Sequence, residues 1–274
     1  MEKIVLNTKQ KVRIFIFSDT HVGNSACDIK ALKRFVFDVA NYCKDENETV
    51  ILLGLGDYID CITPDDKRFN FKEVAKEINL NDVARMQMKE FYAIVEPAVE
   101  KVDYAIFLLG NHEEKLINQK FFNVYDYLCE DLSDGKIIKG GYESLIRLKL
   151  SRSTACVNYD IFATHGAGAG GWREGAAINY IYDISRFYDC DVYLCGHLHR
   201  LVKKTSSFLY INSNNEIAER KRHFGIAGSF LLRNVEKVRS YMEGKRGEPS
   251  LLGYLVLSLN LSEKLMSDLR EIYF

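Results

Sequence analysis

The feature that most constrains the fold of this 274-residue chain is a short apolar run followed at once by a carboxylate. Residues 50–56 read Val-Ile-Leu-Leu-Gly-Leu-Gly, and Asp57 comes directly after them. Such a run, bounded by glycines, is typical of a strand that is buried on both faces of a sheet. Ligands of open α/β sheets bind outside the carboxyl ends of the strands. The run therefore predicts an α/β fold with Asp57 at a binding edge.

Four other stretches repeat this pattern and place a residue of metal-ligand type where an apolar run ends. One example alone would have a structural explanation, such as an Asp that caps a turn or a histidine in the core. Five examples in one chain favour a shared site, because each lies at the expected end of a strand. The polar residues at these ends are Asp19, His21, Asp57, Asp60, Asn111, His112, His165, His197 and His199.

The first half of the chain has the alternation of a largely parallel sheet. Residues 11–18 are β-branched and aromatic, which is typical of a strand, and apolar positions at helical spacing follow from 28 to 44. With the strand at 50–56 these segments form a β-α-β unit. Residues 102–109 predict another strand, followed by a helix from 114 to about 132.

The second half predicts a more antiparallel arrangement. Residues 144–150 and 155–164 are strand-like and are separated by a short polar turn, which indicates a hairpin. The last dozen residues form a polar tail to which no element is assigned. The other expected elements are a helix at 176–188, a strand at 191–195, a hairpin around 208–216 and a strand at 253–261.

Residues 62–101 interrupt the alternation with a turn and two amphipathic helical patterns. The segment is interpreted either as a helical insertion that acts as a lid over the site, or as core helices in which Met86 and Met88 fill gaps. No repeat, low-complexity segment or linker divides the chain. Residues 1–274 are therefore expected to form one domain.

Composition excludes several classes of function. The formal net charge is −1, so there is no general attraction to nucleic acid or to an anionic membrane. The seven cysteines lack the paired short spacings of a zinc ribbon and predict reduced, mostly buried thiols. The amino terminus has no apolar signal-peptide core, and no run is long enough to span a bilayer. We therefore expect a cytoplasmic protein.

The nine polar residues suit divalent metal ions. Histidine, carboxylate and amide oxygen are ligands for Mn²⁺, Fe²⁺ and Zn²⁺, and the absence of cysteine disfavours a structural thiolate zinc site. In Asp19-Thr20-His21 and His197-Leu198-His199 alternate residues lie on the same side of an extended segment. Asp57 has two oxygens and can bridge two ions. Two ions about 3.5–4 Å apart clamp a phosphoryl oxygen and deprotonate a water molecule.

These motifs resemble those of the calcineurin-like metallophosphoesterase superfamily. Its pattern is Asp-x-His, Gly-Asp-x-x-Asp, Gly-Asn-His-Asp/Glu, a lone His and Gly-His-x-His, and all five blocks occur here in that order between residues 19 and 199. The resemblance implies a four-layer α/β/β/α sandwich with mixed sheets. It also implies hydrolysis of a phosphodiester or phosphomonoester by in-line attack of a metal-bridging hydroxide.

The resemblance implies a role for each of the matching residues. Two divalent ions are expected, with Mn²⁺ preferred and Fe²⁺, Zn²⁺ or Ni²⁺ as alternatives. Asp19, His21 and His199 would hold the first ion. Asn111, His165 and His197 would hold the second, and Asp57 would bridge the two. His112 would protonate the leaving oxygen or stabilise developing charge, and the Asp60 carboxylate would orient His112.

Two residues of this chain distinguish between branches of the superfamily. The protein Ser/Thr phosphatase branch has Arg where this chain has Cys61 and Leu109, so the chain is closer to the phosphodiesterase and nuclease branch. A small phosphoester or nucleotide is the preferred substrate. A DNA or RNA nuclease is the alternative, with basic stretches at 200–204, 220–223 and 233–246 as a candidate track. A binding module without turnover is a further alternative.

Four residues near these motifs have weaker assignments. Arg173 and Trp172 could contact the substrate, although a surface salt bridge and a core indole are the simpler interpretations. Tyr58 could line the pocket but is expected in the core. His223 belongs to no motif and is expected on a solvated face. The sequence predicts neither the oligomeric state nor the identity of the substrate.

Overall fold

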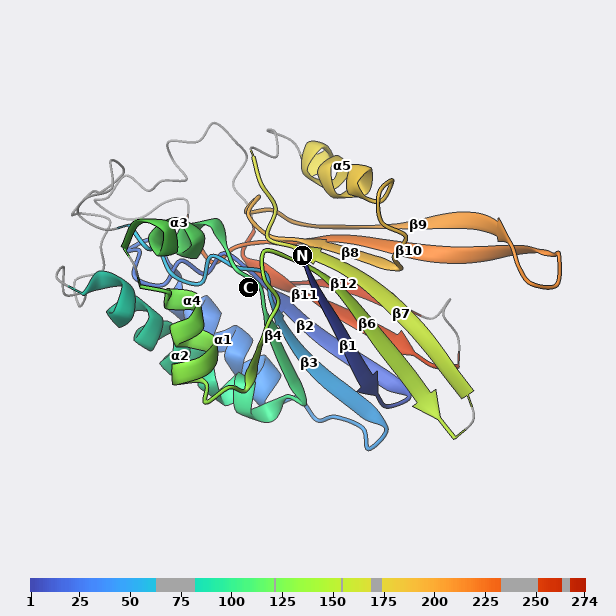
Figure 1. Cartoon of the computed structure of the whole chain (residues 1–274), viewed down its shortest axis with the longest axis horizontal. Coiled ribbons are helices and arrows are strands. Elements are labelled where there is room, and N and C mark those ends of the chain that lie inside the picture. The colour runs from blue at the N-terminus through green and yellow to red at the C-terminus, as the bar shows by residue number, and fades with distance from the viewer. Residues whose placement is uncertain (63–81, 121, 154, 169–173, 233–250, 263–266) are drawn as a thin grey trace.

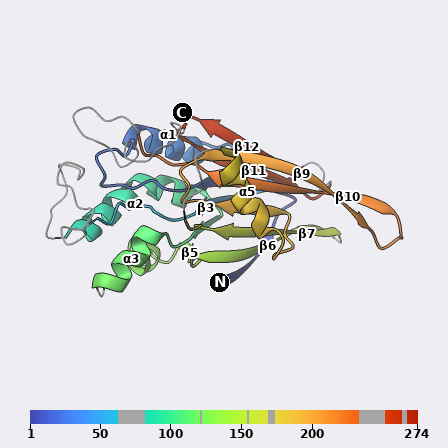
Figure 2. The same ribbon diagram turned by 90° about the horizontal axis from the view of Figure 1, so that it is seen from above.

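Two sheets packed face to face form the centre of the protein (Figure 1). The structure is a computed structural model that describes residues 1–62, 82–120, 122–153, 155–168, 174–232, 251–262 and 267–274. Within these residues each sheet has six strands, and helices cover the outer face of each sheet (Figures 1 and 2). The predicted four-layer α/β/β/α sandwich is therefore confirmed.

The first sheet carries the parallel strands that the sequence predicted. Its order is β12-β11-β2-β3-β4-β5, with β2 to β5 parallel and β11 antiparallel to both β2 and β12. Every residue of β3 is buried, as expected for a strand covered on both faces. The strands are β2 (Lys11–Phe17), β3 (Glu48–Gly54), β4 (Tyr104–Phe107), β5 (Ile137–Lys139), β11 (Gly253–Asn260) and β12 (Asp268–Tyr273).

The second sheet contains the two predicted hairpins, β6–β7 and β9–β10. Its order is β1-β6-β7-β8-β10-β9, and helix α5 (Glu174–Ile184) packs on β8 and β10. Strand β1, which the sequence analysis did not predict, pairs in parallel with β6. The strands are β1 (Glu2–Thr8), β6 (Glu143–Arg152), β7 (Ala155–Thr164), β8 (Val192–Cys195), β9 (Leu201–Ile211) and β10 (Ile217–Ala227).

The core between the sheets is aliphatic, and the core under the helices of the first sheet is aromatic. Ile51 and Ile106 from the first sheet and Ile146 and Ile161 from the second belong to one buried cluster. Helices α1 (Ile29–Ala40) and α2 (Val83–Lys101) cover the other face of the first sheet. Among the described helices, none combines the length and the apolar character that a membrane span requires.

Helix α2 forms the described part of the 62–101 segment and packs in the core. Met88 and Phe91 are fully buried in the aromatic cluster, and the helix packs against α1. Residues 83–101 are therefore a core helix, as one of the two interpretations proposed. Residues 63–81 lie outside the described residues, so the lid interpretation is not tested there.

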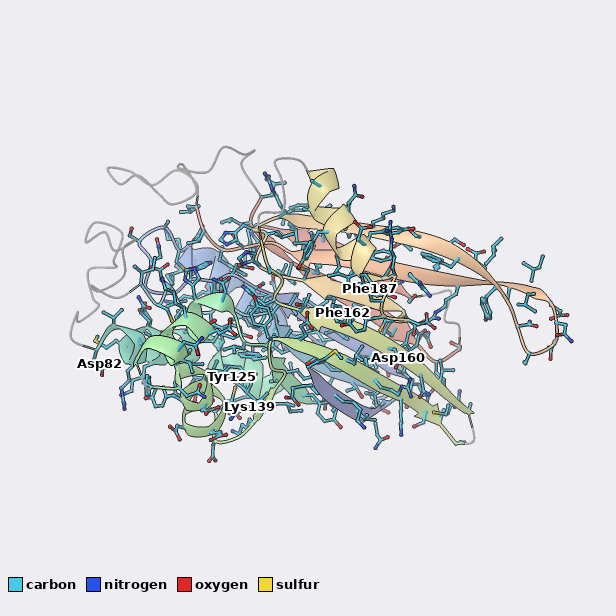
Figure 3. All side chains as sticks on the ribbon, turned by 45° about the horizontal axis from the view of Figure 1, so that its top comes forward. Asp82, Tyr125, Lys139, Asp160, Phe162 and Phe187 are labelled. Atoms are coloured by element: carbon cyan, nitrogen blue, oxygen red, sulfur yellow. The ribbon has the colours of Figure 1, made fainter. Side chains whose placement is uncertain are left out.

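The predicted helix at 114–132 is divided into shorter pieces. Helix α3 spans Asn111–Lys120, and α4 (Val124–Asp126) continues into a π-helical turn at Tyr127–Leu132. The side chain of Asn123 accepts hydrogen bonds from the main-chain N–H groups of Tyr125 and Asp126, so it starts a second helix. Apolar periodicity does not detect such an internal cap. Figure 3 shows Tyr125 on this segment, and its hydroxyl donates to the Phe107 carbonyl.

The expectation of a solvated His223 is wrong. Its side chain is 2% exposed and lies on β10 between the sheets. Nδ1 is 2.9 Å from Thr205 Oγ1 and Nε2 is 2.7 Å from Ser267 Oγ. Ser267 directly precedes β12, which forms from the polar tail by pairing with β11. The local sequence of basic residues around His223 carries no information about this distant partner.

Buried His223 is expected to make the fold acid-sensitive. Burial lowers the pKa of His223 to about 4, while a histidine in the unfolded chain titrates near pH 6.5. The unfolded chain therefore binds a proton first, and the stability present above pH 6.5 is lost as the pH falls toward 4. The loss from this group is at most about 3 kcal/mol. Urea unfolding at pH 7.5 and pH 5 should show a steeper loss for the metal-free wild type than for His223→Gln. Equal losses would contradict the assignment.

Candidate metal centre

The five polar motifs meet where the two sheets face each other at the carboxyl ends of their strands. Asp19 follows β2, Asp57 follows β3 and Asn111 follows β4, three neighbouring parallel strands of the first sheet. His165 follows β7 and His197 follows β8, which are parallel neighbours in the second sheet. Parallel strands end at one edge of a sheet, so residues far apart in sequence converge. The structure brings together all seven predicted metal ligands and His112.

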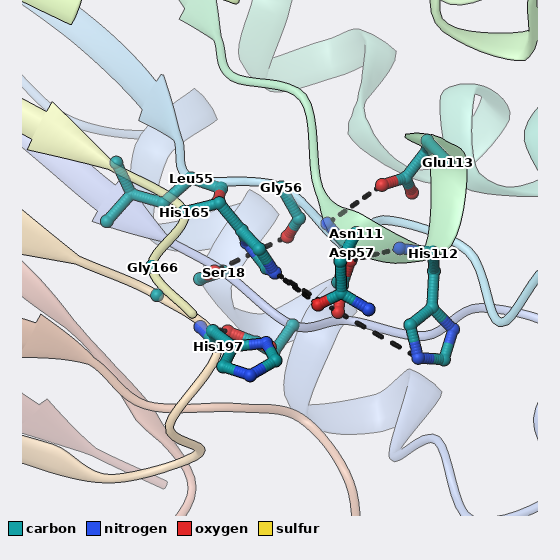
Figure 4. Close-up of polar contacts among 12 residues, drawn as sticks. Ser18, Leu55, Gly56, Asp57, Asn111, His112, Glu113, His165, Gly166 and His197 are labelled. Atoms are coloured by element: carbon teal, nitrogen blue, oxygen red, sulfur yellow. Dashed lines mark hydrogen bonds and ion pairs between the residues drawn. The ribbon is translucent and has the colours of Figure 1, made fainter. Parts of the chain in front are cut away.

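Asp57 lies at the centre of the group. Its Oδ2 is 3.3 Å from Nε2 of His165, 3.9 Å from Nε2 of His21 and 4.0 Å from Nε2 of His112. Its Oδ1 accepts a hydrogen bond of 2.9 Å from the main-chain N–H of His112 (Figure 4). One carboxylate therefore contacts histidines that come from three different loops.

Asp19 organises the first half of the site. It is completely buried, and Oδ2 accepts a 2.8 Å hydrogen bond from the main-chain N–H of His197. Oδ1 lies 3.2 Å from Nε2 of His199 and 3.8 Å from Nε2 of His21. These three side chains offer ligand atoms that lie within 4.8 Å of one another.

Two histidines of the second half are oriented by main-chain carbonyls. His165 donates from Nδ1 to Leu55 O at 2.6 Å, which leaves Nε2 2.9 Å from Asn111 Oδ1. His197 donates from Nε2 to Gly168 O at 3.0 Å, which leaves Nδ1 without a described partner. Metal-ligating histidines typically donate their other ring N–H in this way, because this fixes the ring and the tautomer.

Buried polar atoms without partners show that a cation fits this site. Among the described residues Asp19 Oδ1, both ring nitrogens of His21, Nδ1 of His197 and Nδ1 of His199 are buried and make no hydrogen bond. An unsatisfied buried polar atom costs about 1–3 kcal/mol. Divalent cations coordinated by the atoms that face the centre would remove much of this cost, and the carboxylate, imidazole and amide set suits Mn²⁺, Fe²⁺ or Zn²⁺.

The pKa shifts of three predicted ligands favour metal binding, and that of His165 opposes it. Burial raises the pKa values of Asp19 and Asp57, but the neighbouring histidines lower them by more than burial raises them. Both pKa values therefore lie below the ordinary range of a carboxyl group. Burial lowers the pKa of His21 to about 4. At neutral pH the site thus offers ionised carboxylates and a neutral imidazole, which are the forms that bind metals. Burial lowers the pKa of His165, but nearby Asp57 raises it to about 9, so His165 is protonated in the metal-free site at neutral pH and must release this proton to bind a metal.

The main chain is strained at the same residues. Asp19, His21, Asp57, His197 and His199 all have positive φ, between 47° and 61°. Few non-glycine residues adopt this left-handed conformation, and such residues cluster at functional sites. Hydrogen bonds between the first two loops, from Asp19 N to Gly56 O and from His21 N to Asp57 O, hold this geometry. The local fold therefore places ligand side chains at a cost in backbone energy.

Asp60 orients His112 differently from the prediction. The His112 Nδ1–H donates to the main-chain carbonyl of Asp60 at 2.5 Å, and not to the carboxylate as expected. The carboxylate accepts a 3.1 Å hydrogen bond from Asn24 and lies 3.8 Å from Nδ1 of His21. The tight turn after Asp57 aims the carbonyl at His112, and residue types alone do not show this. Nε2 of His112 still faces the centre of the site.

Glu113 is a residue of the site that the sequence analysis did not single out. It is completely buried, and its carboxylate accepts hydrogen bonds from the main-chain N–H groups of Asp57, Tyr58 and Ile59 at 3.1, 2.8 and 3.2 Å. Burial and then the charge of Asp57 raise the pKa of Glu113 to about 7. Its position inside the Gly-Asn-His-Glu block was the available signal.

Gly110 allows α3 to approach the Asp57 loop closely. A Cβ at Gly110 would lie 2.1 Å from Asp57 N and 2.3 Å from Asp57 Oδ1. Gly56 faces it with φ +98°, and a Cβ there would lie 2.6 Å from Gly110 Cα. These two glycines let the loops after β3 and β4 pack in direct contact, which is what brings Asn111 and Asp57 to one place.

Of the three weaker expectations around the site, the described residues bear on one. Tyr58 is completely buried and donates its hydroxyl hydrogen to Leu108 O, so it is a core residue as expected. Arg173 and Trp172 lie outside the described residues, and their predicted contacts with substrate are not tested.

Comparison with known proteins gives one family. A family model described as calcineurin-like phosphoesterase matches residues 12–201. No protein with a curated description matches the chain. Similar solved structures include Vps29 from Entamoeba histolytica complexed with Zn²⁺, with 12% identity, a TM-score of 0.39 and coverage of 95% of this chain and 98% of that one. A predicted phosphoesterase from Streptococcus pneumoniae has 11% identity, a TM-score of 0.30 and coverage of 96% and 98%.

Proposed function

Because this chain belongs to the calcineurin-like phosphoesterase family, we propose that it is a metal-dependent hydrolase of phosphoesters with two divalent ions at the Asp57 site. The observation that carries the proposal is the convergence of six ligand-type side chains around Asp57. Several buried ligand atoms of this group lack hydrogen-bond partners among the described residues. Asp19, His21 and His199 would hold one ion, Asn111, His165 and His197 the other, and Asp57 would bridge them. Mn²⁺ is the preferred ion.

The bound ions would polarise the phosphoryl oxygens and activate a water molecule for attack at phosphorus. The protein supplies a pre-arranged set of ligands, since the carboxylates are already ionised and several histidines are already oriented. Such preorganisation avoids reorganisation during the reaction. The protein therefore contributes positioning and charge.

His112 is proposed as the group that acts on the leaving oxygen. Its Nδ1–H is held by the Asp60 carbonyl, so the ring cannot turn freely. Its side chain is 11% exposed, and Nε2 lies 4.0 Å from Asp57 Oδ2. From this position Nε2 can donate a proton to the leaving oxygen or a hydrogen bond to developing negative charge.

A small phosphoester or nucleotide is the proposed substrate in preference to nucleic acid. One of the basic stretches that could follow a phosphate backbone, residues 233–246, lies outside the described residues. Arg220 and Arg222 form ion pairs with Asp189 at 2.9 and 2.5 Å, and Lys203 donates to Leu269 O. These charges are engaged within the fold, which supports the small substrate.

The test is hydrolysis of a bis-aryl phosphodiester by the Mn²⁺-loaded protein, with His112→Ala as the comparison. Wild type should turn over the ester, and the variant should lose about 10²–10⁴-fold in kcat, because general acid catalysis contributes on this scale. Mn²⁺ stoichiometry should be equal in both proteins. Equal activity in the two would contradict the role of His112, and an inactive wild type across phosphomonoesters, phosphodiesters, dinucleotides and single-stranded DNA would favour the binding-module alternative.

A further inference from the structure

A buried polar side chain on the core helix α2 lies against two of the metal-site loops. Gln87 is 1% exposed, although it lies among apolar residues such as Val83, Met88 and Phe91 on the buried face of the helix. A buried amide without hydrogen bonds is costly, so its partners indicate why it is there. Gln87 lies outside the five motifs.

Gln87 contacts the loop that follows Asp60. Its Oε1 accepts a 3.0 Å hydrogen bond from the main-chain N–H of Cys61. Cys61 has φ +53°, a conformation that non-glycine residues rarely adopt. The hydrogen bond therefore holds a strained residue directly after the one whose carbonyl orients His112.

The same amide packs on the loop that follows His21. A Cβ added to Gly23 would lie 2.3 Å from Gln87 Nε2 and 2.4 Å from its Cδ, so the side chain occupies the space over this glycine. Gly23 has φ +93°, which suits glycine and not a residue with a side chain. Gln87 thus contacts the main chain two residues after one predicted metal ligand.

These two loops run side by side as one unit. Val22 and Ile59 form a parallel bridge, Val22 N donates to Tyr58 O at 2.9 Å, and Asp60 N donates to Val22 O at 3.1 Å. Gln87 lies at the end of this paired segment and connects both loops to helix α2. A shift of the segment would move His21 and Asp60 together.

We propose that Gln87 is a positioning residue that anchors the paired loops 19–24 and 57–61 to helix α2 and thereby sets the geometry of the metal centre. This inference rests on the proposed metal-dependent function. Gln87 acts by placing the main chain of these loops. Its replacement should therefore weaken metal binding first and lower turnover as a result. Groups that orient ligands from outside the coordination sphere typically change metal affinity 10–100-fold when mutated.

The test compares Gln87→Met with Val95→Ala. Met keeps an unbranched chain over Gly23 but lacks Oε1, so the fold should be retained. Val95 is 1% exposed on the same helix, two turns further along, and its truncation lowers stability by leaving a cavity away from the loops. Mn²⁺ affinity is measured by calorimetry without substrate, alongside the thermal midpoint and kcat on the bis-aryl ester.

Gln87→Met should bind Mn²⁺ at least about 10-fold more weakly than wild type, with a matching fall in kcat at subsaturating metal. Val95→Ala should lower the thermal midpoint but keep wild-type affinity. Wild-type affinity in Gln87→Met, or an equal loss in Val95→Ala, would overturn the proposal. Because affinity is measured without substrate, an inactive wild type that binds Mn²⁺ would contradict the phosphoesterase function and leave this test intact.

Discussion

Asp57→Asn should abolish detectable binding of the metal pair and lower phosphoesterase activity by at least about 10³-fold, the scale expected when charge stabilisation at a reacting centre is removed. The amide has one oxygen in place of two and carries no charge. If its NH₂ group took the place of Oδ1, the His112 main-chain N–H would lose its acceptor, and if it took the place of Oδ2, an N–H would occupy the position from which a carboxylate oxygen faces Nε2 of His165. Both bridging and charge balance are therefore lost.

Mn²⁺ calorimetry and steady-state kinetics measure this effect, with Asp160→Asn as the matched control. Asp160 lies on β7 and pairs with Arg147 at 2.7 Å away from the metal centre, so its replacement should leave metal binding unchanged. The metal-free Asp57→Asn protein should unfold at a temperature close to that of wild type, because removal of a buried charge offsets the lost hydrogen bond. Two Mn²⁺ ions bound with wild-type affinity would contradict the central position given to Asp57.

Glu113→Ala should lower the free energy of unfolding by several kcal/mol. Three buried main-chain N–H groups would lose their acceptor, and each unsatisfied group costs about 1–3 kcal/mol. The Asp57 turn, which has φ 55°, would then be free to relax, so Mn²⁺ affinity should also fall. Glu114→Ala is the control, since Glu114 is the exposed neighbour on the same helix. Urea unfolding measures both variants, and similar stabilities would contradict the anchoring role of Glu113.

Elements whose patterns are local in the sequence were predicted, and elements that depend on distant partners were not. The buried strand at 50–56 became β3, and the predicted hairpins became β6–β7 and β9–β10, because burial on two faces and alternation leave periodic patterns. The element boundaries were less well predicted, as the division at Asn123 shows. Strands β1 and β12 were missed. Both are edge strands, and β1 pairs with β6, which is far away in the sequence.

The metal site likewise has features that the sequence predicted and features that it did not. Residue types and their order predicted which side chains meet, since each motif follows a strand and parallel strands end together. The order did not show that Asp60 holds His112 with its carbonyl, that Glu113 binds three N–H groups or that His223 is buried beside Ser267. Those contacts depend on main-chain direction and on packing between distant segments.

The sequence by itself determined the α/β class, the family motifs and the identity of the ligand-type residues, because hydrophobic periodicity and side-chain chemistry are local properties. Only the tertiary structure decided how these residues are oriented: the left-handed turns at Asp19, Asp57 and His197, the close approach of Gly110 and the anchoring of the loops by Glu113 and Gln87. The reason is physical. Strained turns and buried polar contacts persist only when the surrounding packing holds them, and that packing comes from parts of the chain far apart in sequence.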